Sequence, residues 1–198
     1  MLTAQLTTLA TAIAIGYLAG SIPFAWLAAR SVGVNILLVG SGNPGTANVF
    51  RIVDRRLGIL VFLADVSKGA VPVVIALAIG VPKELAFLAG AAAIAGHWRP
   101  ILPWLSGGGG LAAATGAAVA VAPLPGLVAL AFGFPALAIF KSSGHAAAIG
   151  MSALVISGYA VFLEWETTTG ALVLAGLIVA RHSPVEMITR RLGRSSAT

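Results

Sequence analysis

Long runs of apolar residues dominate the chain, and short polar stretches separate them. A helix that crosses the hydrocarbon core of a bilayer, which is about 30 Å thick, needs about 20 mostly apolar residues. The pattern therefore predicts an all-α fold, a polytopic bundle of about seven transmembrane helices. Several runs are shorter than this length, so five spans also fit the pattern. The seven predicted spans are residues 6–29, 57–79, 85–97, 110–121, 124–140, 146–163 and 168–180.

The composition supports a membrane protein over a soluble one. Hydrophobic residues make up 59% of the 198 residues, charged residues 9%, and the mean hydropathy is +1.00. A soluble domain usually carries about 25% charged residues. With so few charges, lipid must cover the surface. We expect one transmembrane domain over residues 1–192, followed by a loose tail at 193–198, and no separate soluble domain.

The charges predict the orientation of the bundle. Because Lys and Arg stay in cytoplasmic loops, the N-terminus is expected outside and the C-terminus in the cytoplasm. The absence of Lys or Arg before Arg30 makes the first run a retained span and not a cleaved signal peptide. The basic loops contain Arg30, Arg51, Arg55, Arg56, Arg99, Lys141, Arg181, Arg190, Arg191 and Arg194, and the opposite loops contain Lys83, Glu84, Glu164 and Glu166.

The net charge of +6 does not indicate a nucleic-acid partner, because these cations lie in short loops where they contact anionic lipid headgroups. The chain contains no cysteine, which excludes thiolate metal sites. Its few acidic and histidine residues are scattered, so we expect no metal site.

The most informative polar segment is VGSGNPGTANVFR, from Val39 to Arg51, in a predicted cytoplasmic loop. Its glycines allow positive φ, and successive backbone N–H groups can then bind an anion. Arg51 adds a guanidinium group suited to phosphate. The alternative is a Gly/Asn turn with a basic anchor. The candidate phosphate ligands are Ser41, Gly42, Asn43, Gly45, Asn48 and Arg51.

Two further candidates lie at predicted helix positions. Asp65 and Lys68 share one face of the second span, and charged residues at membrane depth usually face the bundle interior. They form either an ion pair alone or part of a binding site. His97, in the sequence GHWRP, is either structural or catalytic. Trp98 and Trp104 beside it are expected to be interface anchors.

A glycine-rich stretch precedes the fourth span, and a helix N-terminus of this kind favours phosphate. The alternative is close packing of helices through small residues. The candidate phosphate ligands here are Gly107, Gly108, Gly109 and Gly110. Other phosphate-compatible groups are predicted on the same membrane face, namely Arg99, Lys141, His145, Arg181 and His182.

Five motifs, in order along nearly the whole chain, resemble those of the bacterial acyl-phosphate:glycerol-3-phosphate acyltransferases, the PlsY family. The segment from Val39 to Arg51 resembles the family's VGSGNxGxTNVxR. The other four are GSIPF at residues 20–24, DxxKG at 65–69, GHWRP at 96–100, which resembles GHxFP, and the Arg181-His182 pair.

The resemblance implies a seven-helix enzyme of the bacterial cell membrane with its active site on the cytoplasmic side. Its substrates would be acyl phosphate and glycerol 3-phosphate, and its products lysophosphatidic acid and phosphate. Because acyl phosphate is already activated, no cofactor is expected. His97 or His182 would orient or deprotonate the hydroxyl group, with Arg51 as a further catalytic candidate. Lys68 would bind phosphate, with support from Asp65, Arg99 and Lys141.

The chain also departs from the family pattern. The family's second glycine loop reads KGGKGxAT, and Ser106, Gly109 and Ala113 stand here in place of two lysines and a threonine. These losses favour an alternative, an inactive relative that binds or transports lipid phosphates. The intact first loop favours the enzyme. A small-molecule transporter would predict internal repeats, and none is visible.

Overall fold

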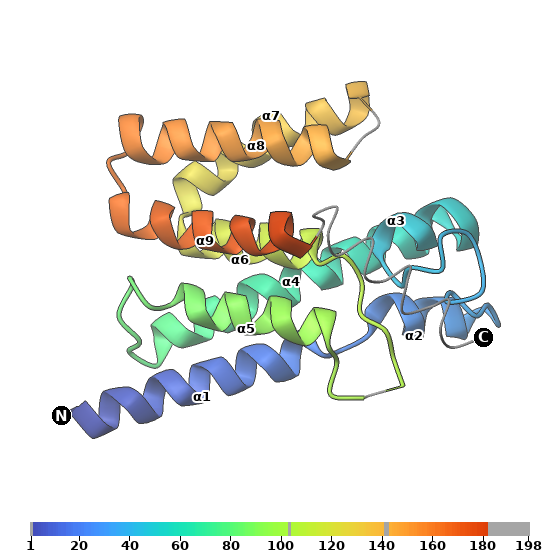
Figure 1. Cartoon of the computed structure of the whole chain (residues 1–198), viewed down its shortest axis with the longest axis horizontal. Coiled ribbons are helices and arrows are strands. Elements are labelled where there is room, and N and C mark those ends of the chain that lie inside the picture. The colour runs from blue at the N-terminus through green and yellow to red at the C-terminus, as the bar shows by residue number, and fades with distance from the viewer. Residues whose placement is uncertain (1, 103, 141–142, 182–198) are drawn as a thin grey trace.

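The computed structural model describes residues 2–102, 104–140 and 143–181, and over these residues all regular elements are helical (Figure 1). The predicted all-α class is therefore confirmed. The elements are α1 (Leu2–Gly20), α2 (Phe24–Ser31), α3 (Thr46–Asn48), the π-helical turn η1 (Val49–Val53), α4 (Arg55–Ala78), α5 (Phe87–Trp98), α6 (Leu111–Val121), α7 (Pro123–Phe140), α8 (Ser143–Ile156), the π-helical turn η2 (Ser157–Val161) and α9 (Trp165–Arg181).

Each of the seven predicted spans corresponds to a helix, with the first span divided between α1 and α2 and η2 extending α8. Within the part of the chain that the structure describes, three segments are long and apolar enough by themselves to cross a membrane: residues 2–31, 55–78 and 123–140. Shorter apolar helices fill the rest of the bundle. Pro123 is the first residue of α7 and separates it from α6, because proline is well placed in the first turn of a helix.

The first predicted span, residues 6–29, lies within the candidate membrane span at residues 2–31, but it is not one continuous helix. The helix ends at Gly20 and resumes at Phe24. Pro23 explains the break, because proline has no N–H group and disfavours helical geometry in the residue before it. The break turns the carbonyl oxygen of Ile22 toward α4, where it accepts a hydrogen bond of 3.0 Å from Lys68 Nζ.

The predicted loop before the second span contains α3 and η1, which the apolar pattern did not indicate. After them, Asp54 begins α4 as its N-cap, and its carboxylate accepts a hydrogen bond of 2.9 Å from the Leu57 N–H group. Such a cap satisfies one of the unpaired donors in the first turn of a helix. The cap therefore sets the start of α4 immediately after η1.

Small residues let the central helices approach closely. A Cβ atom on Gly69 would collide with the backbone of Ala113, and one on Gly116 would collide with the backbone of Val66, so α4 and α6 touch along their main chains. Gly16 and Gly20 of α1 meet α5 in the same way. Interfaces of this kind are typical of membrane helices, where packing replaces the hydrophobic effect between helices.

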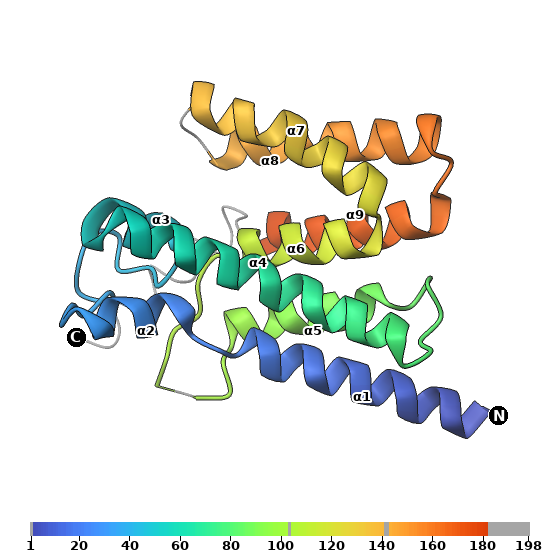
Figure 2. The same ribbon diagram turned by 180° about the vertical axis from the view of Figure 1, so that it is seen from behind.

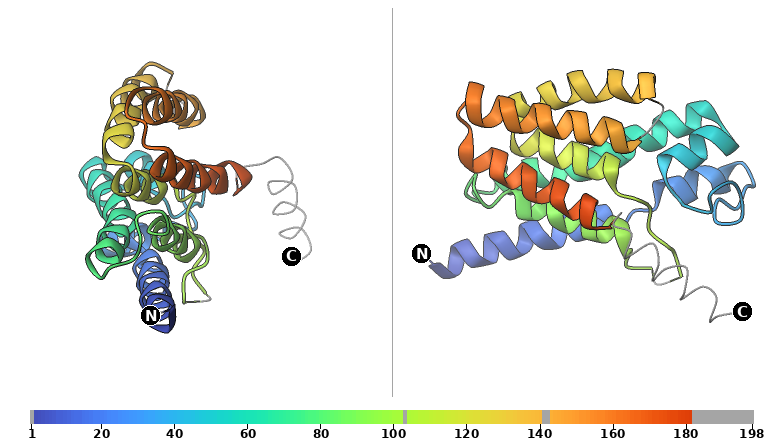
Figure 3. Two further views of the ribbon diagram at one scale, coloured as in Figure 1. Left: turned by 90° about the vertical axis from the view of Figure 1, so that its left-hand side faces the viewer. Right: turned by 45° about the horizontal axis from the view of Figure 1, so that its top comes forward.

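The two ends of the bundle differ in charge. The start of α1, the α4–α5 loop and the α8–α9 connection lie at one end, and α2, α3 and the α5–α6 loop lie at the other (Figures 1 and 2). The first end therefore has Lys83, Glu84, Glu164 and Glu166, and the second has Arg30, Arg51 and Arg99, as the sequence predicts. The α7–α8 hairpin lies at the outer edge of the molecule (Figure 3).

Candidate active site

A small pocket lies where the α1–α2 break, the first glycine-rich loop, α4, α5 and the α5–α6 loop meet, at the arginine-rich end of the bundle. These five segments are far apart in the sequence, so the fold alone brings them together. The residues that line the pocket are Gly20, Ser21, Ile22, Pro23, Phe24, Ala25, Trp26, Pro44, Asp65, Lys68, His97, Pro100, Ser106, Gly107 and Gly108.

Asp65 and Lys68 form a buried ion pair in the wall of this pocket. Lys68 Nζ lies 2.8 Å from Asp65 Oδ1, and both side chains are 3% exposed. The ammonium group also donates to Ile22 O and lies 5.5 Å from the centre of the Phe24 ring. An ammonium group has three N–H donors, and among the described residues the Asp65 carboxylate and the Ile22 carbonyl group accept from two of them. The third can donate to a ligand in the pocket.

His97 stands beside the ion pair at the end of α5. Its Nδ1 atom is 4.0 Å from Asp65 Oδ1, and the side chain is 6% exposed. Thr46, the first residue of α3, lies against the same carboxylate. Asp65 therefore lies among a lysine, a histidine and a threonine from three different helices.

The second glycine loop lies directly on the end of α5. A Cβ atom on Gly107 would collide with the carbonyl groups of His97 and Trp98. One on Gly108 would approach His97 Nε2 to 2.7 Å and Pro44 O to 2.9 Å. Larger residues are thus excluded, and the two glycine loops come into contact through Gly108 and Pro44.

Asn48 organises the first glycine-rich loop from within. Its Oδ1 atom accepts from the Ser41 N–H group at 3.2 Å, and its Nδ2 group donates to Val39 O at 3.0 Å and Ile36 O at 3.4 Å. Gly40 and Gly42 have φ of 59° and 66°, which other residues rarely adopt. The Asn48 side chain is thus occupied in shaping the loop.

The predicted site residues divide into two groups. The pocket is lined by Asp65, Lys68, His97, Gly107 and Gly108. Ser41, Asn43 and Arg51 are exposed on the first loop and on η1, outside the pocket wall. Gly42 and Gly45 lie in the same loop, and Gly109 and Gly110 complete the second loop up to α6.

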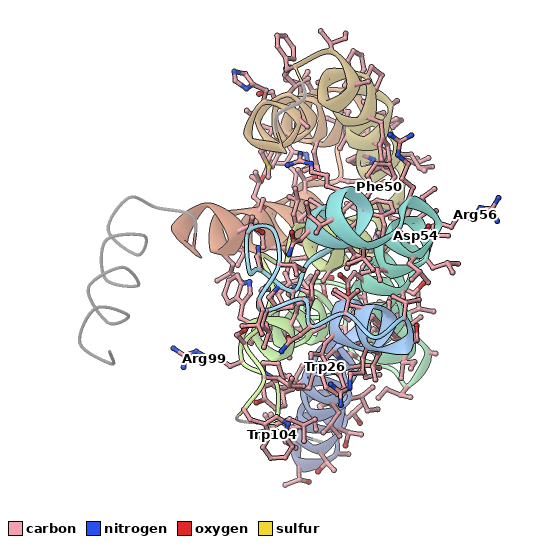
Figure 4. The ribbon with its side chains drawn as sticks, turned by 90° about the vertical axis from the view of Figure 1, so that its right-hand side faces the viewer. Trp26, Phe50, Asp54, Arg56, Arg99 and Trp104 are labelled. Atoms are coloured by element: carbon pink, nitrogen blue, oxygen red, sulfur yellow. The ribbon has the colours of Figure 1, made fainter. Side chains whose placement is uncertain are left out.

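One predicted supporting residue, Arg99, is not brought to the pocket. Arg99 is exposed and points outward, as do Arg56 on the opposite side and Trp104 below it (Figure 4). Lys141 and His182 lie outside the described residues. Arg99 still contributes its backbone, because its carbonyl oxygen accepts a hydrogen bond of 2.9 Å from the Tyr17 hydroxyl group.

The residue-by-residue interpretation missed the contribution of the α1–α2 break. Ser21, Ile22 and Phe24 line the pocket, and two of them contact the Lys68 ammonium group. In the sequence, the motif GSIPF is distinctive only by its resemblance to the family motif. Its Pro23 was the available signal, because a proline within an apolar run releases backbone carbonyls that can then face a polar site.

Comparisons with known proteins agree along nearly the whole chain. The family model for glycerol-3-phosphate acyltransferase matches residues 10–191. Glycerol-3-phosphate acyltransferase 5 of Dehalococcoides mccartyi is 36% identical over 183 residues, which cover 89% of this chain and 75% of that protein. The enzyme of Geobacter sulfurreducens is 36% identical over 169 residues, which cover 85% of this chain and 87% of the relative.

A solved structure has the same fold. The crystal structure of PlsY (YgiH), an integral membrane glycerol 3-phosphate acyltransferase, in its glycerol 3-phosphate form, superposes with a TM-score of 0.74. Its sequence is 32% identical, and the match covers 93% of this chain and 92% of the other. The chain therefore belongs to the glycerol-3-phosphate acyltransferase family and is an integral membrane protein.

Proposed function

We propose that this protein transfers a fatty acyl group from acyl phosphate to the 1-hydroxyl group of glycerol 3-phosphate, and that it produces lysophosphatidic acid and inorganic phosphate. The observation that carries the proposal is the meeting of both glycine-rich loops with Lys68 and His97 at one end of a membrane bundle. Both substrates contain phosphate, and backbone amides with a nearby cation are suited to bind it.

The reaction needs no further activation, because acyl phosphate is a mixed anhydride. The hydroxyl oxygen attacks the acyl carbonyl carbon, and the bond from that carbon to the phosphate oxygen breaks. The hydroxyl proton passes to His97 or to the departing phosphate. The protein must hold two anions close together and align the two reacting groups, and alignment of this kind supplies a large part of the rate increase in many enzymes.

The residues have distinct proposed tasks. Lys68 supplies a fixed positive charge inside the pocket, and its ion pair holds it in place. Ser41, Asn43 and Arg51 are exposed to water outside the pocket, and they bind the phosphate group of the substrate that enters from the water. The amides of Gly107 to Gly110 replace the two cations that the family places in this loop, since oriented backbone N–H groups also stabilise anions.

The orientation in the membrane follows from the same site. Glycerol 3-phosphate is a water-soluble metabolite of the cytoplasm, so the arginine-rich end that contains the pocket faces the cytoplasm. This agrees with the positive-inside rule and puts the N-terminus outside and the C-terminus inside. A reporter fused at the C-terminus that responds only in the cytoplasm is expected to give a signal.

The test is an assay of the purified protein in liposomes with acyl phosphate and radiolabelled glycerol 3-phosphate. Labelled lysophosphatidic acid and an equal amount of phosphate are expected, and omission of glycerol 3-phosphate is expected to abolish phosphate release. The variant Ser106→Lys/Gly109→Lys is assayed in parallel. Turnover by that variant alone would reject the proposal and identify an inactive relative whose second loop has lost its function.

A further inference from the structure

The second glycine loop contains four consecutive glycines, Gly107 to Gly110, and no cation. Glycine loses more conformational entropy on folding than any other residue, so this loop needs an external support to keep one shape. Amides that bind a transferring phosphate are effective only when they are already oriented. A side chain outside the loop must therefore hold these amides in place.

Trp98 makes the relevant contact. Its indole N–H group donates a hydrogen bond of 3.1 Å to the carbonyl oxygen of Gly109. The sequence predicted an interface anchor at this position, but the side chain is half-buried and packs against the central apolar cluster of α1, α4, α5, α6 and α9. Its neighbour Trp104 is 71% exposed and has the character of an anchor.

This hydrogen bond fixes the direction of an amide as well as a carbonyl. Gly109 C=O and Gly110 N–H belong to one planar trans peptide unit, in which the two bonds point in opposite directions. Holding the carbonyl against the indole therefore directs the Gly110 N–H group away from Trp98. Gly110 is also the N-cap of α6, where the helix dipole favours a bound anion.

Gly110 is shaped to accept the indole. Its φ is 85°, a conformation that favours glycine, and a Cβ atom there would approach Trp98 Nε1 to 2.6 Å. Gly107 meets the Trp98 carbonyl group in a similar way. The loop thus contacts Trp98 at both ends, with Gly110 against the indole ring and Gly107 against the Trp98 backbone.

We propose that Trp98 is a positioning residue that holds the second glycine loop in its phosphate-binding shape. The family's lysines would bind phosphate directly by their charge, and in their absence the oriented amides of this loop depend on Trp98. The inference rests on the proposed function, since it assumes that this loop binds the phosphate of a substrate. It assigns to Trp98 an indirect role through the loop and no contact with the reacting atoms.

The test compares Trp98→Phe, which keeps an aromatic ring and removes the N–H donor, with the control Trp104→Phe at the exposed site. A hydrogen bond of this type contributes about 0.5–1.5 kcal/mol, so we expect the KM for glycerol 3-phosphate to rise about three- to tenfold in Trp98→Phe. The control is expected to keep the KM and the melting temperature of the wild type. An unchanged KM in Trp98→Phe would overturn the proposal.

A second measurement does not depend on activity. Hydrogen–deuterium exchange of the peptide containing residues 106–112 is expected to be faster in Trp98→Phe than in the wild type, and unchanged in Trp104→Phe. If the wild type shows no acyl transfer, the proposed function fails, and the exchange result still decides the role of Trp98. Equal exchange in all three proteins would overturn that role.

Discussion

The carbonyl oxygen of Ile22, at the break between α1 and α2, accepts a hydrogen bond from the Lys68 ammonium group on α4, 46 residues later in the chain. The contact ties the broken first span to the ion pair in the pocket wall. Pro23 interrupts the helix and leaves the Ile22 carbonyl group available, and this group helps to stabilise the Lys68 ammonium group, whose charge is costly at membrane depth.

The buried ion pair gives the first prediction. Removing one partner of a buried pair leaves an uncompensated charge and typically costs about 3–5 kcal/mol. Asp65→Ala is therefore expected to lower the melting temperature in detergent strongly, and Asp65→Ala/Lys68→Ala less than the sum of the two single variants. The double variant is expected to remain inactive, because the pocket has lost its cation. Strictly additive losses would show that the two charges do not stabilise each other.

The hydrogen bonds of Asn48 give the second prediction. Asn48→Asp keeps the shape of the side chain but replaces the Nδ2 donor with an oxygen that faces two carbonyl groups. Each lost bond is worth about 1 kcal/mol, so acyl transfer is expected to fall at least about tenfold as the first loop loses its shape. Asn35→Ala, at an exposed residue that accepts one bond from Leu37 N–H, is the control. Wild-type kinetics in Asn48→Asp would contradict the prediction.

Arg51 gives the third prediction. A charge-assisted hydrogen bond contributes about 1.5–3 kcal/mol, so Arg51→Ala is expected to reduce kcat/KM for glycerol 3-phosphate by about tenfold or more. Arg56→Ala is the matched control, because that exposed side chain points outward from the bundle (Figure 4). Initial rates in liposomes measure both. Equal losses in the two variants would indicate a general effect of surface charge and not a contact with substrate.

The interface between α4 and α6 gives the fourth prediction. Gly116→Ala adds a Cβ atom that collides with the backbone of Val66, and overpacking of this kind costs about 1–3 kcal/mol. Gly176→Ala is the control, because a Cβ there meets nothing within 4 Å. Thermal unfolding in detergent is expected to separate the two variants clearly. A Gly116→Ala protein as stable as the control would show that the helices can move apart without cost.

The sequence alone determined that the protein lies in a lipid bilayer, that its fold is all-α, and to which family it belongs. Runs of apolar residues and 9% charged residues leave only a membrane bundle as a stable solution, since backbone groups in lipid must be paired within helices. The positions of the main helices followed from the same runs and from Pro123. The ordered motifs then identified the family, because their spacing extends along nearly the whole chain.

Only the tertiary structure decided which residues share a pocket. Lys68 and His97 line it, whereas Arg99 points away, although all three looked equally suitable in the sequence. Hydropathy specifies which residues lie in helices, but the rotation of each helix and the path of each loop depend on packing between distant segments. The side-chain bonds of Asn48 and Trp98 to backbone carbonyls exist only after that packing is complete, so no local pattern could have revealed them.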